Sequence, residues 1–257
     1  MKTRFIFLLV VIMASFLSYR SGAQTSAMKE ELAKAQDLAK QGNTAEASKV
    51  LTGMMEKYPD SFEIVQNWLF INREKIPGEE AAIVELGNLE KIYPGNTAIL
   101  FAKTFLQTEN GHLAEALINA EKLTTVKPEA ALNWLMKGQI LESMNKNDEA
   151  LNSYEKATTL DSNNADAWQN KAGILLKTKK FDEAINSFNK AIQLVPGQPV
   201  FIYNRGCAYC LKGDNAKALA DLEKAISMNP QFKSYAIKDE DFKTLWENED
   251  FKKLTSQ

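Results

Sequence analysis

The sequence has few of the residues that catalytic and metal sites most often use. Its 257 residues include one histidine, His112, and two cysteines, Cys207 and Cys210. A lone histidine cannot form a Ser-His-Asp triad or a histidine-based metal site, and two cysteines alone do not complete a zinc site. Glycine-rich phosphate-binding patterns are also missing. We therefore expect no catalytic residues, no cofactor and no metal, and predict that the protein is not an enzyme.

Neither charge nor hydrophobicity is concentrated in a long run. Lys and Arg number 31 and Asp and Glu number 33, so the formal net charge is −2. This balance lacks the basic surplus of a nucleic-acid-binding domain. The apolar run at residues 5–17 is shorter than the roughly 20 residues that a membrane-spanning helix needs.

The apolar run has the features of a secretory signal. Lys2 and Arg4 precede it, and Ser21 and Ala23 supply the small residues that signal peptidase requires. We therefore expect residues 1–23 to be a cleaved signal peptide and the mature protein to be exported, either periplasmic or secreted. No cysteine follows the run, which excludes a lipoprotein anchor. The alternative is an uncleaved N-terminal membrane anchor.

A landmark recurs along the chain at a spacing of about 34 residues. Five of its six positions are prolines and one is a serine: Pro59, Pro94, Pro128, Ser162, Pro196 and Pro230. Twelve residues before each landmark stands an alanine: Ala47, Ala82, Ala116, Ala150, Ala184 and Ala218. A methyl group at such a position lets two helices pack closely. A period of 34 residues is that of the tetratricopeptide repeat.

Three segments resemble a tetratricopeptide repeat residue by residue. The motif residues are Trp134, Gly138, Ala150, Tyr154 and Ala157; Trp168, Gly173, Phe181, Ala184, Phe188, Ala191 and Pro196; and Gly206, Tyr209, Gly213, Ala218, Ala225 and Pro230. The resemblance implies an all-α fold, a right-handed superhelical α-solenoid of about six helix-turn-helix repeats with C-terminal capping helices. The solenoid spans 24–232, with repeats near 28–62, 63–96, 97–130, 131–164, 165–198 and 199–232.

Several local patterns refine this expectation. Turns are predicted at Gly42-Asn43, Gly111-His112, Asn147-Asp148 and Gly213-Asp214. The second repeat departs most from the family pattern, because Phe70 occupies its expected small position and Pro77-Gly78 lies in its turn. In residues 233–257 apolar and charged side chains alternate, which predicts a helical cap on the sixth repeat. A detachable segment that binds a membrane or a partner is the alternative.

The resemblance also implies a binding surface. In the family, the second, fifth, ninth and twelfth positions of each first helix line the concave face. Carried over, the predicted partner-binding groove comprises Phe101, Phe105, Leu132, Leu135, Gln139, Gln169, Leu176, Tyr203, Cys207 and Cys210. Many of these are apolar, which predicts a partner peptide or amphipathic helix held by apolar contact. The alternative is that the C-terminal segment buries some of them. The fifth and ninth positions hold no lysine, which argues against a receptor for C-terminal carboxylates.

Cys207 and Cys210 lie three residues apart on one predicted helix, within disulfide range. Incidental thiols or a passive bridge are favoured over a redox site, since a redox motif normally opens a helix after a strand. The sequence therefore predicts an exported, non-enzymatic adaptor or scaffold that binds other proteins and no nucleic acid, and that contacts a membrane only if its signal is uncleaved. The alternatives are an assembly or stability factor of a cell-envelope complex, an envelope-acting enzyme on a helical-repeat scaffold, and a redox protein.

Overall fold

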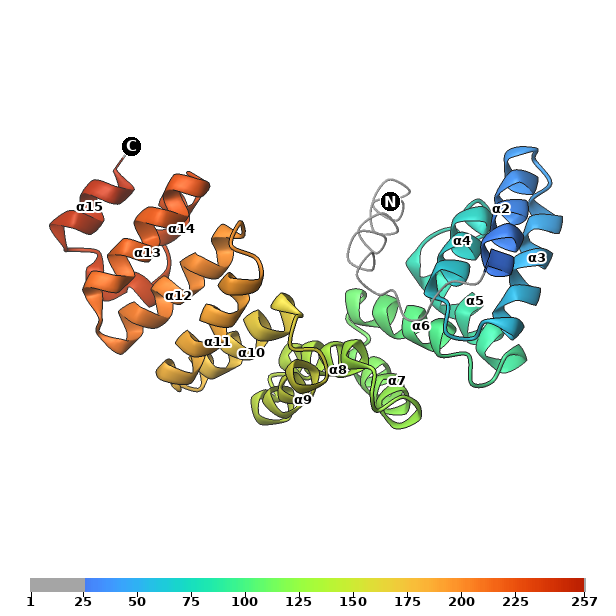
Figure 1. Cartoon of the computed structure of the whole chain (residues 1–257), viewed down its shortest axis with the longest axis horizontal. Helices are drawn as coiled ribbons and strands as arrows, with labels where there is room; N and C mark the ends of the chain where they lie inside the picture. The colour runs from blue at the N-terminus through green and yellow to red at the C-terminus, as the bar shows by residue number, and fades with distance from the viewer. Residues whose placement is uncertain (1–25, 257) are drawn as a thin grey trace. The chain divides into compact units, whose positions relative to one another are not determined.

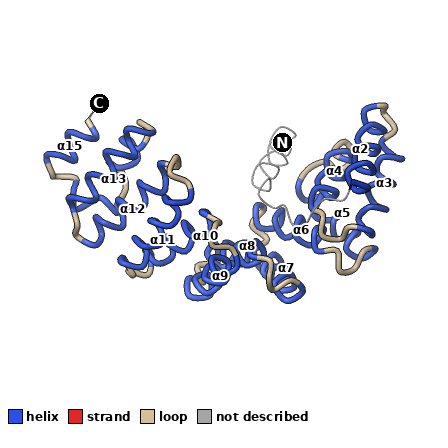
Figure 2. The backbone as a smooth tube through the Cα atoms, in the orientation of Figure 1, coloured by secondary structure: helices blue, strands red, loops and turns tan. Residues whose placement is uncertain are grey.

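The computed structural model describes residues 26–256, so the predicted signal peptide, 1–23, lies outside the described residues. Those residues form helices joined by short turns, with no strand among them (Figure 2). The chain divides into two compact units at Val126 and Lys127. The N-terminal unit contains α2 (Ser26–Lys40), α3 (Thr44–Lys57), α4 (Phe62–Asn72), α5 (Glu79–Ile92), α6 (Thr97–Glu109) and α7 (Leu113–Val126).

The C-terminal unit begins with six longer helices and ends with three short ones (Figure 1). The longer helices are α8 (Ala131–Ser143), α9 (Asn147–Leu160), α10 (Ala165–Lys177), α11 (Phe181–Leu194), α12 (Pro199–Lys212) and α13 (Asn215–Met228). The short elements are α14 (Phe232–Ala236), the 3-10 helix η1 (Glu240–Leu245) and α15 (Glu249–Thr255). Each of the pairs α8–α9, α10–α11 and α12–α13 packs closely, as the predicted helix-turn-helix repeats require.

The alanine column explains why the helices pair. All six alanines are fully buried: Ala47, Ala82, Ala116, Ala150, Ala184 and Ala218. A larger side chain at this position would separate the two helices of a repeat. Gly138 plays a similar part on α8, because a Cβ atom there would lie 2.5 Å from Cε1 of the buried Tyr154 on α9. The two helices of a repeat thus pack closely because a small residue on one helix faces a large side chain on the other.

Most predicted turns are present, and one is displaced. Gly42, Gly111 and Gly213 adopt positive φ angles of 83°, 80° and 89°, which glycine does at no steric cost. The turn predicted at Asn147-Asp148 is wrong by two residues, because Asn147 already begins α9 and the left-handed residue is Asn145. Asp148 instead lies in the first turn of α9, where its negative charge interacts favourably with the positive end of the helix dipole.

The second repeat is irregular, at the place where the sequence departs from the pattern. Its first helix, α4, packs on α3 and α6, while α5 packs on α6. Phe70 is 46% exposed on α4, with the guanidinium carbon of Arg73 4.3 Å from its ring centroid. A phenylalanine cannot occupy the position that holds a small residue in a closed repeat. Six residues, including Pro77-Gly78, then lead from α4 to α5.

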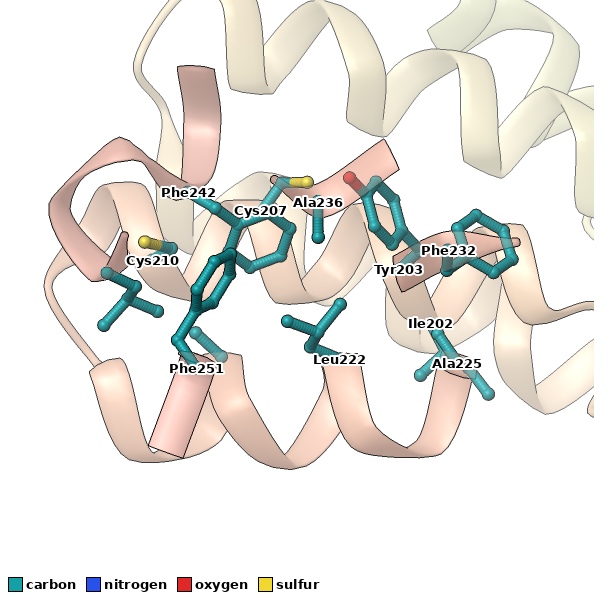
Figure 3. Packing of buried hydrophobic residues seen from close by; sticks show 12 residues of the cluster. Ile202, Tyr203, Cys207, Cys210, Leu222, Ala225, Phe232, Ala236, Phe242 and Phe251 are labelled. Carbon is teal, nitrogen blue, oxygen red and sulfur yellow. The ribbon is translucent and has the colours of Figure 1, made fainter. Parts of the chain in front are cut away.

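Residues 232–256, called here the C-terminal segment, cap the sixth repeat as predicted. Their buried side chains are Phe232, Ala236, Phe242, Leu245 and Phe251, which pack with Ile202, Leu222 and Ala225 of α12 and α13 (Figure 3). Membrane-spanning helices were also sought in the described part of the chain, and none of its helices has the length and hydrophobicity required.

Candidate protein-binding face

The second, fifth, ninth and twelfth positions of α6, α8, α10 and α12 are called here the A-helix face. On α12 the C-terminal segment covers this face (Figure 3). The ring of Tyr203 stacks on Phe232 with ring centroids 4.6 Å apart and meets Phe242 edge-on at 5.5 Å. Tyr203, Cys207 and Cys210 are consequently 6%, 3% and 3% exposed.

These three side chains do not line an open groove, which corrects the prediction for this part of the face. The physical reason is that the apolar side chains of the C-terminal segment must be buried away from water. Phe242 and Leu245 alternate with charged residues, and the apolar face of the last repeat is the surface that can bury them. The alternative that this segment buries part of the face is therefore the correct one for α12.

Polar contacts fasten the same interface. The Tyr203 hydroxyl donates a 2.7 Å hydrogen bond to Oδ2 of Asp239, and the Cys207 thiol lies 3.8 Å from the same oxygen. Sγ of Cys210 lies 3.2 Å from Oγ1 of Thr244. Oδ1 of Asp239 also accepts a hydrogen bond from the backbone N–H of Asp241 and so caps η1. Asp239 is the polar centre of the contact between α12 and the C-terminal segment.

This environment opposes redox chemistry at the cysteines. Both are free thiols, and their sulfur atoms point in different directions (Figure 3). Burial, followed by the carboxylates of Asp239 and Asp241, raises the pKa of Cys207 well above its usual value. Burial likewise raises the pKa of Cys210. Redox-active cysteines need a lowered pKa and access to solvent, and these two have neither.

The A-helix face is more accessible on α8 and α10. Gln139 is exposed, Leu132 and Leu176 are half-buried, and Leu135 is buried. Leu176 borders the cluster that the C-terminal segment forms with α12. The face therefore continues from the covered part on α12 to a less covered part on α10 and α8, which are neighbouring helices.

Gln169 on α10 carries an unusual polar atom. Its side-chain oxygen Oε1 is buried and accepts no hydrogen bond from any described residue. A buried acceptor without a donor costs about 1–3 kcal/mol, so such atoms are uncommon in folded proteins. The position is the fifth of its helix, equivalent to Tyr203 on α12. An N–H group laid on this face would supply the missing donor.

In the N-terminal unit, α6 carries the two remaining predicted groove residues. Phe101 is buried, and its ring meets that of Phe62 edge-on with centroids 5.6 Å apart. Phe105 is half-buried. Phe101 therefore packs within the unit, whereas Phe105 keeps part of its ring accessible.

The same unit has a hollow of about 570 Å³ that sequence reasoning missed. It lies among α5, α6 and α7 and is lined in part by Val84, Gly87 and Lys103. The Lys103 ammonium group pairs with Glu90 at 2.8 Å. Gly87 is a sequence signal for this hollow, since a glycine within a helix leaves space where a side chain would stand.

Comparisons with known proteins show which families and solved structures this chain is similar to. Two family models described as tetratricopeptide repeat match residues 135–199 and 200–232. No curated protein matches the chain in sequence. Among solved structures, YrrB, described as a tetratricopeptide repeat protein with an unusual peptide-binding site, is 21% identical with a TM-score of 0.59. That match covers 75% of this chain and 100% of YrrB.

Two further structures share the fold. A tetratricopeptide repeat protein from Parabacteroides merdae is 21% identical with a TM-score of 0.57, covering 89% of this chain and 98% of its own. MamA is 21% identical with a TM-score of 0.58, covering 64% and 95%. The period of 34 residues, the paired helices and the two matching models agree. Residues 135–232 match the tetratricopeptide repeat models, and the chain shares the fold of tetratricopeptide repeat proteins.

Proposed function

We propose that this protein is a non-catalytic scaffold that holds a helical segment of a partner protein on the A-helix face of α8 and α10. The observation that carries the proposal is the docking of the C-terminal segment on the equivalent face of α12. There, short helices insert Phe232 and Phe242 beside Tyr203 and add a hydrogen bond through Asp239. The chain itself thus provides an example of the kind of ligand this face accepts.

The positions on α8 and α10 are equivalent to those on α12 by the 34-residue period. Leu132 and Leu176 offer half-buried apolar surface, and Gln139 offers an exposed amide. A partner helix with large apolar side chains on one face matches this surface, since such helices bind grooves through residues three and four apart. The free oxygen of Gln169 favours a partner that also brings an N–H donor.

The family supports binding as the class of activity. Tetratricopeptide solenoids present extended surfaces to other proteins, and YrrB, which shares the fold, is described as having a peptide-binding site. That description belongs to YrrB, and its transfer to this chain is part of the proposal. Residues 1–23 have the pattern of a signal peptide, so we propose that the partner is met outside the cytoplasm. A role in assembling a cell-envelope complex is one form of this function.

The test is capture of a partner from an envelope extract by the mature chain and by two variants. Leu132→Glu/Gln139→Glu adds two charges to the A-helix face. Leu160→Glu adds a charge to an exposed apolar residue on α9, outside that face, and serves as the control. Circular dichroism establishes that all three chains are equally helical.

We expect the native chain and Leu160→Glu to capture the same protein, and Leu132→Glu/Gln139→Glu to lose it. Apolar contact with a partner is lost when a carboxylate must be buried against it. Equal capture by all three chains would contradict the assignment of the face. Loss in Leu160→Glu alone would move the site to the second helices of the repeats.

A further inference from the structure

Three side chains with metal-binding chemistry converge beside α12 from two parts of the chain. Cys207 comes from α12, Asp239 from the turn before η1, and Asp241 from η1 itself. One ligand atom of each lies within 4.8 Å of the other two. Sγ of Cys207 lies 3.8 Å from Oδ2 of Asp239. The group forms only because the C-terminal segment folds back onto α12.

Within the described residues, the two carboxylates of this group have no positively charged partner. Neither Asp239 nor Asp241 forms an ion pair with another described residue, and the Asp241 carboxylate makes no hydrogen bond there either. Lys243, two residues further along the chain, pairs instead with Glu240 at 2.9 Å. Two carboxylates and a buried thiol therefore face one another, and no described lysine or arginine pairs with either carboxylate.

The chemistry of this group favours a cation. Two carboxylates held near a thiol repel one another when all three are charged, and a divalent cation among them would offset that repulsion.

We propose that Cys207, Asp239 and Asp241 bind one divalent metal ion of the zinc type. A thiolate with two carboxylates suits zinc, which accepts sulfur and oxygen ligands, whereas magnesium and calcium prefer oxygen alone. Binding needs the Cys207 thiol to release its proton to solvent, so that a thiolate and two carboxylates face the ion. Three protein ligands leave the fourth tetrahedral position to water.

Such an ion joins α12 to the C-terminal segment. Since Cys207 lies on one and the two aspartates on the other, metal binding and docking of the segment must stabilise each other. The proposal goes beyond the scaffold function, because metal binding would stabilise the docking of the C-terminal segment on the sixth repeat. It holds whether or not α8 and α10 bind a partner.

Cys210 is not part of the site, although it lies three residues after Cys207. Its sulfur contacts Oγ1 of Thr244 at 3.2 Å and points away from the Cys207 sulfur (Figure 3). Cys210→Ser is therefore a matched control for Cys207→Ser, since both remove a buried thiol from α12. Glu240→Gln is the corresponding control for Asp241→Asn, because it removes a neighbouring exposed carboxylate.

The test titrates the untagged mature chain with zinc sulfate by calorimetry and with cadmium chloride by the ultraviolet charge-transfer absorbance of cadmium thiolate. We expect one ion per chain for the native protein, Cys210→Ser and Glu240→Gln. Cys207→Ser and Asp241→Asn should bind about tenfold more weakly or worse, because each lacks a ligand. Zinc should also slow tryptic cleavage at Lys238 and Lys243 in the native chain and not in Asp241→Asn.

Three results would overturn the proposal. One is the absence of stoichiometric binding to the native chain. Another is equal binding by all five proteins, which would indicate adventitious surface sites. The third is loss of binding in Cys210→Ser with retention in Cys207→Ser. Circular dichroism of each variant separates a lost ligand from a lost fold.

Discussion

The hydroxyl group of Tyr203 donates a 2.7 Å hydrogen bond to Asp239, a residue 36 positions further along the chain. The same tyrosine ring stacks on Phe232, so one side chain of α12 holds the C-terminal segment by both apolar and polar contact. Burial and the hydrogen bond to Asp239 both raise the pKa of Tyr203, which therefore stays protonated and able to donate. The last repeat thus has its A-helix face occupied by the chain itself.

Loosening this contact should expose the two thiols. Phe242→Ala removes a fully buried ring that meets both Tyr203 and Phe251, and such truncations cost about 3–5 kcal/mol. We expect Cys207 and Cys210 to react with iodoacetamide much faster in this variant than in the native chain. The rate of labelling, followed by mass spectrometry, measures the opening.

Ile237→Ala is the control for this experiment, since Ile237 lies in the same segment and is 48% exposed. Its thiols should label at the native rate. Equal labelling of Phe242→Ala and the native chain would show that the ring does not hold the segment on α12.

The repeat architecture could be predicted because its signals are local. Ala184 and the side chains around it recur every 34 residues, and each repeat needs only its neighbours to bury its core. The sequence offers the covering of Tyr203 only as an alternative, because it depends on a contact between residues far apart in sequence. Nothing in the local pattern around Tyr203 distinguishes a free face from an occupied one.

The metal site proposed near Cys207 also depends on contacts between residues far apart in sequence. The cysteine pattern predicts no metal, since two cysteines alone do not complete a zinc site and the sequence has no second pair. Asp239 and Asp241 come from a segment whose aspartates look like ordinary helix-start residues, and Asp239 does cap η1. Sequence also placed Phe101 in the groove, whereas the structure packs it against Phe62.

Two glycines inside helices should respond in opposite ways to alanine. Gly138→Ala places a Cβ atom 2.5 Å from the Tyr154 ring, so the helices of the fourth repeat must separate. We expect a loss of about 1–3 kcal/mol in the free energy of unfolding. Gly173→Ala meets no atom within 4 Å and should stabilise α10 by about 0.5–1 kcal/mol. Urea denaturation of both variants checks the signs, and destabilisation of equal size would contradict the packing described.

The ion pair between Arg205 and Asp221 should contribute to the stability of the sixth repeat. Two 2.7 Å hydrogen bonds join the guanidinium group to the buried carboxylate, and a third reaches Asn189 on α11. Asp221→Ala leaves the half-buried Arg205 without its main partner and should cost about 2 kcal/mol.

The comparison for this variant is Lys253→Ala, which breaks an exposed pair with Asp250. Exposed pairs contribute about 0–1 kcal/mol, so its unfolding free energy should stay close to that of the native chain. Thermal unfolding measured at low and at high salt distinguishes the two. A similar cost for both variants would show that the Arg205 pair is no better than a surface contact.

Photo-cross-linking can detect the proposed contact between a partner protein and the A-helix face of α8 and α10 inside the cell. A photoreactive amino acid is placed at Gln139 on this face or at Leu160 on α9, and the chain is irradiated in the cells that produce it. We expect a discrete cross-linked protein from position 139 and none from position 160. A cross-link from position 160 alone, with none from 139, would contradict it.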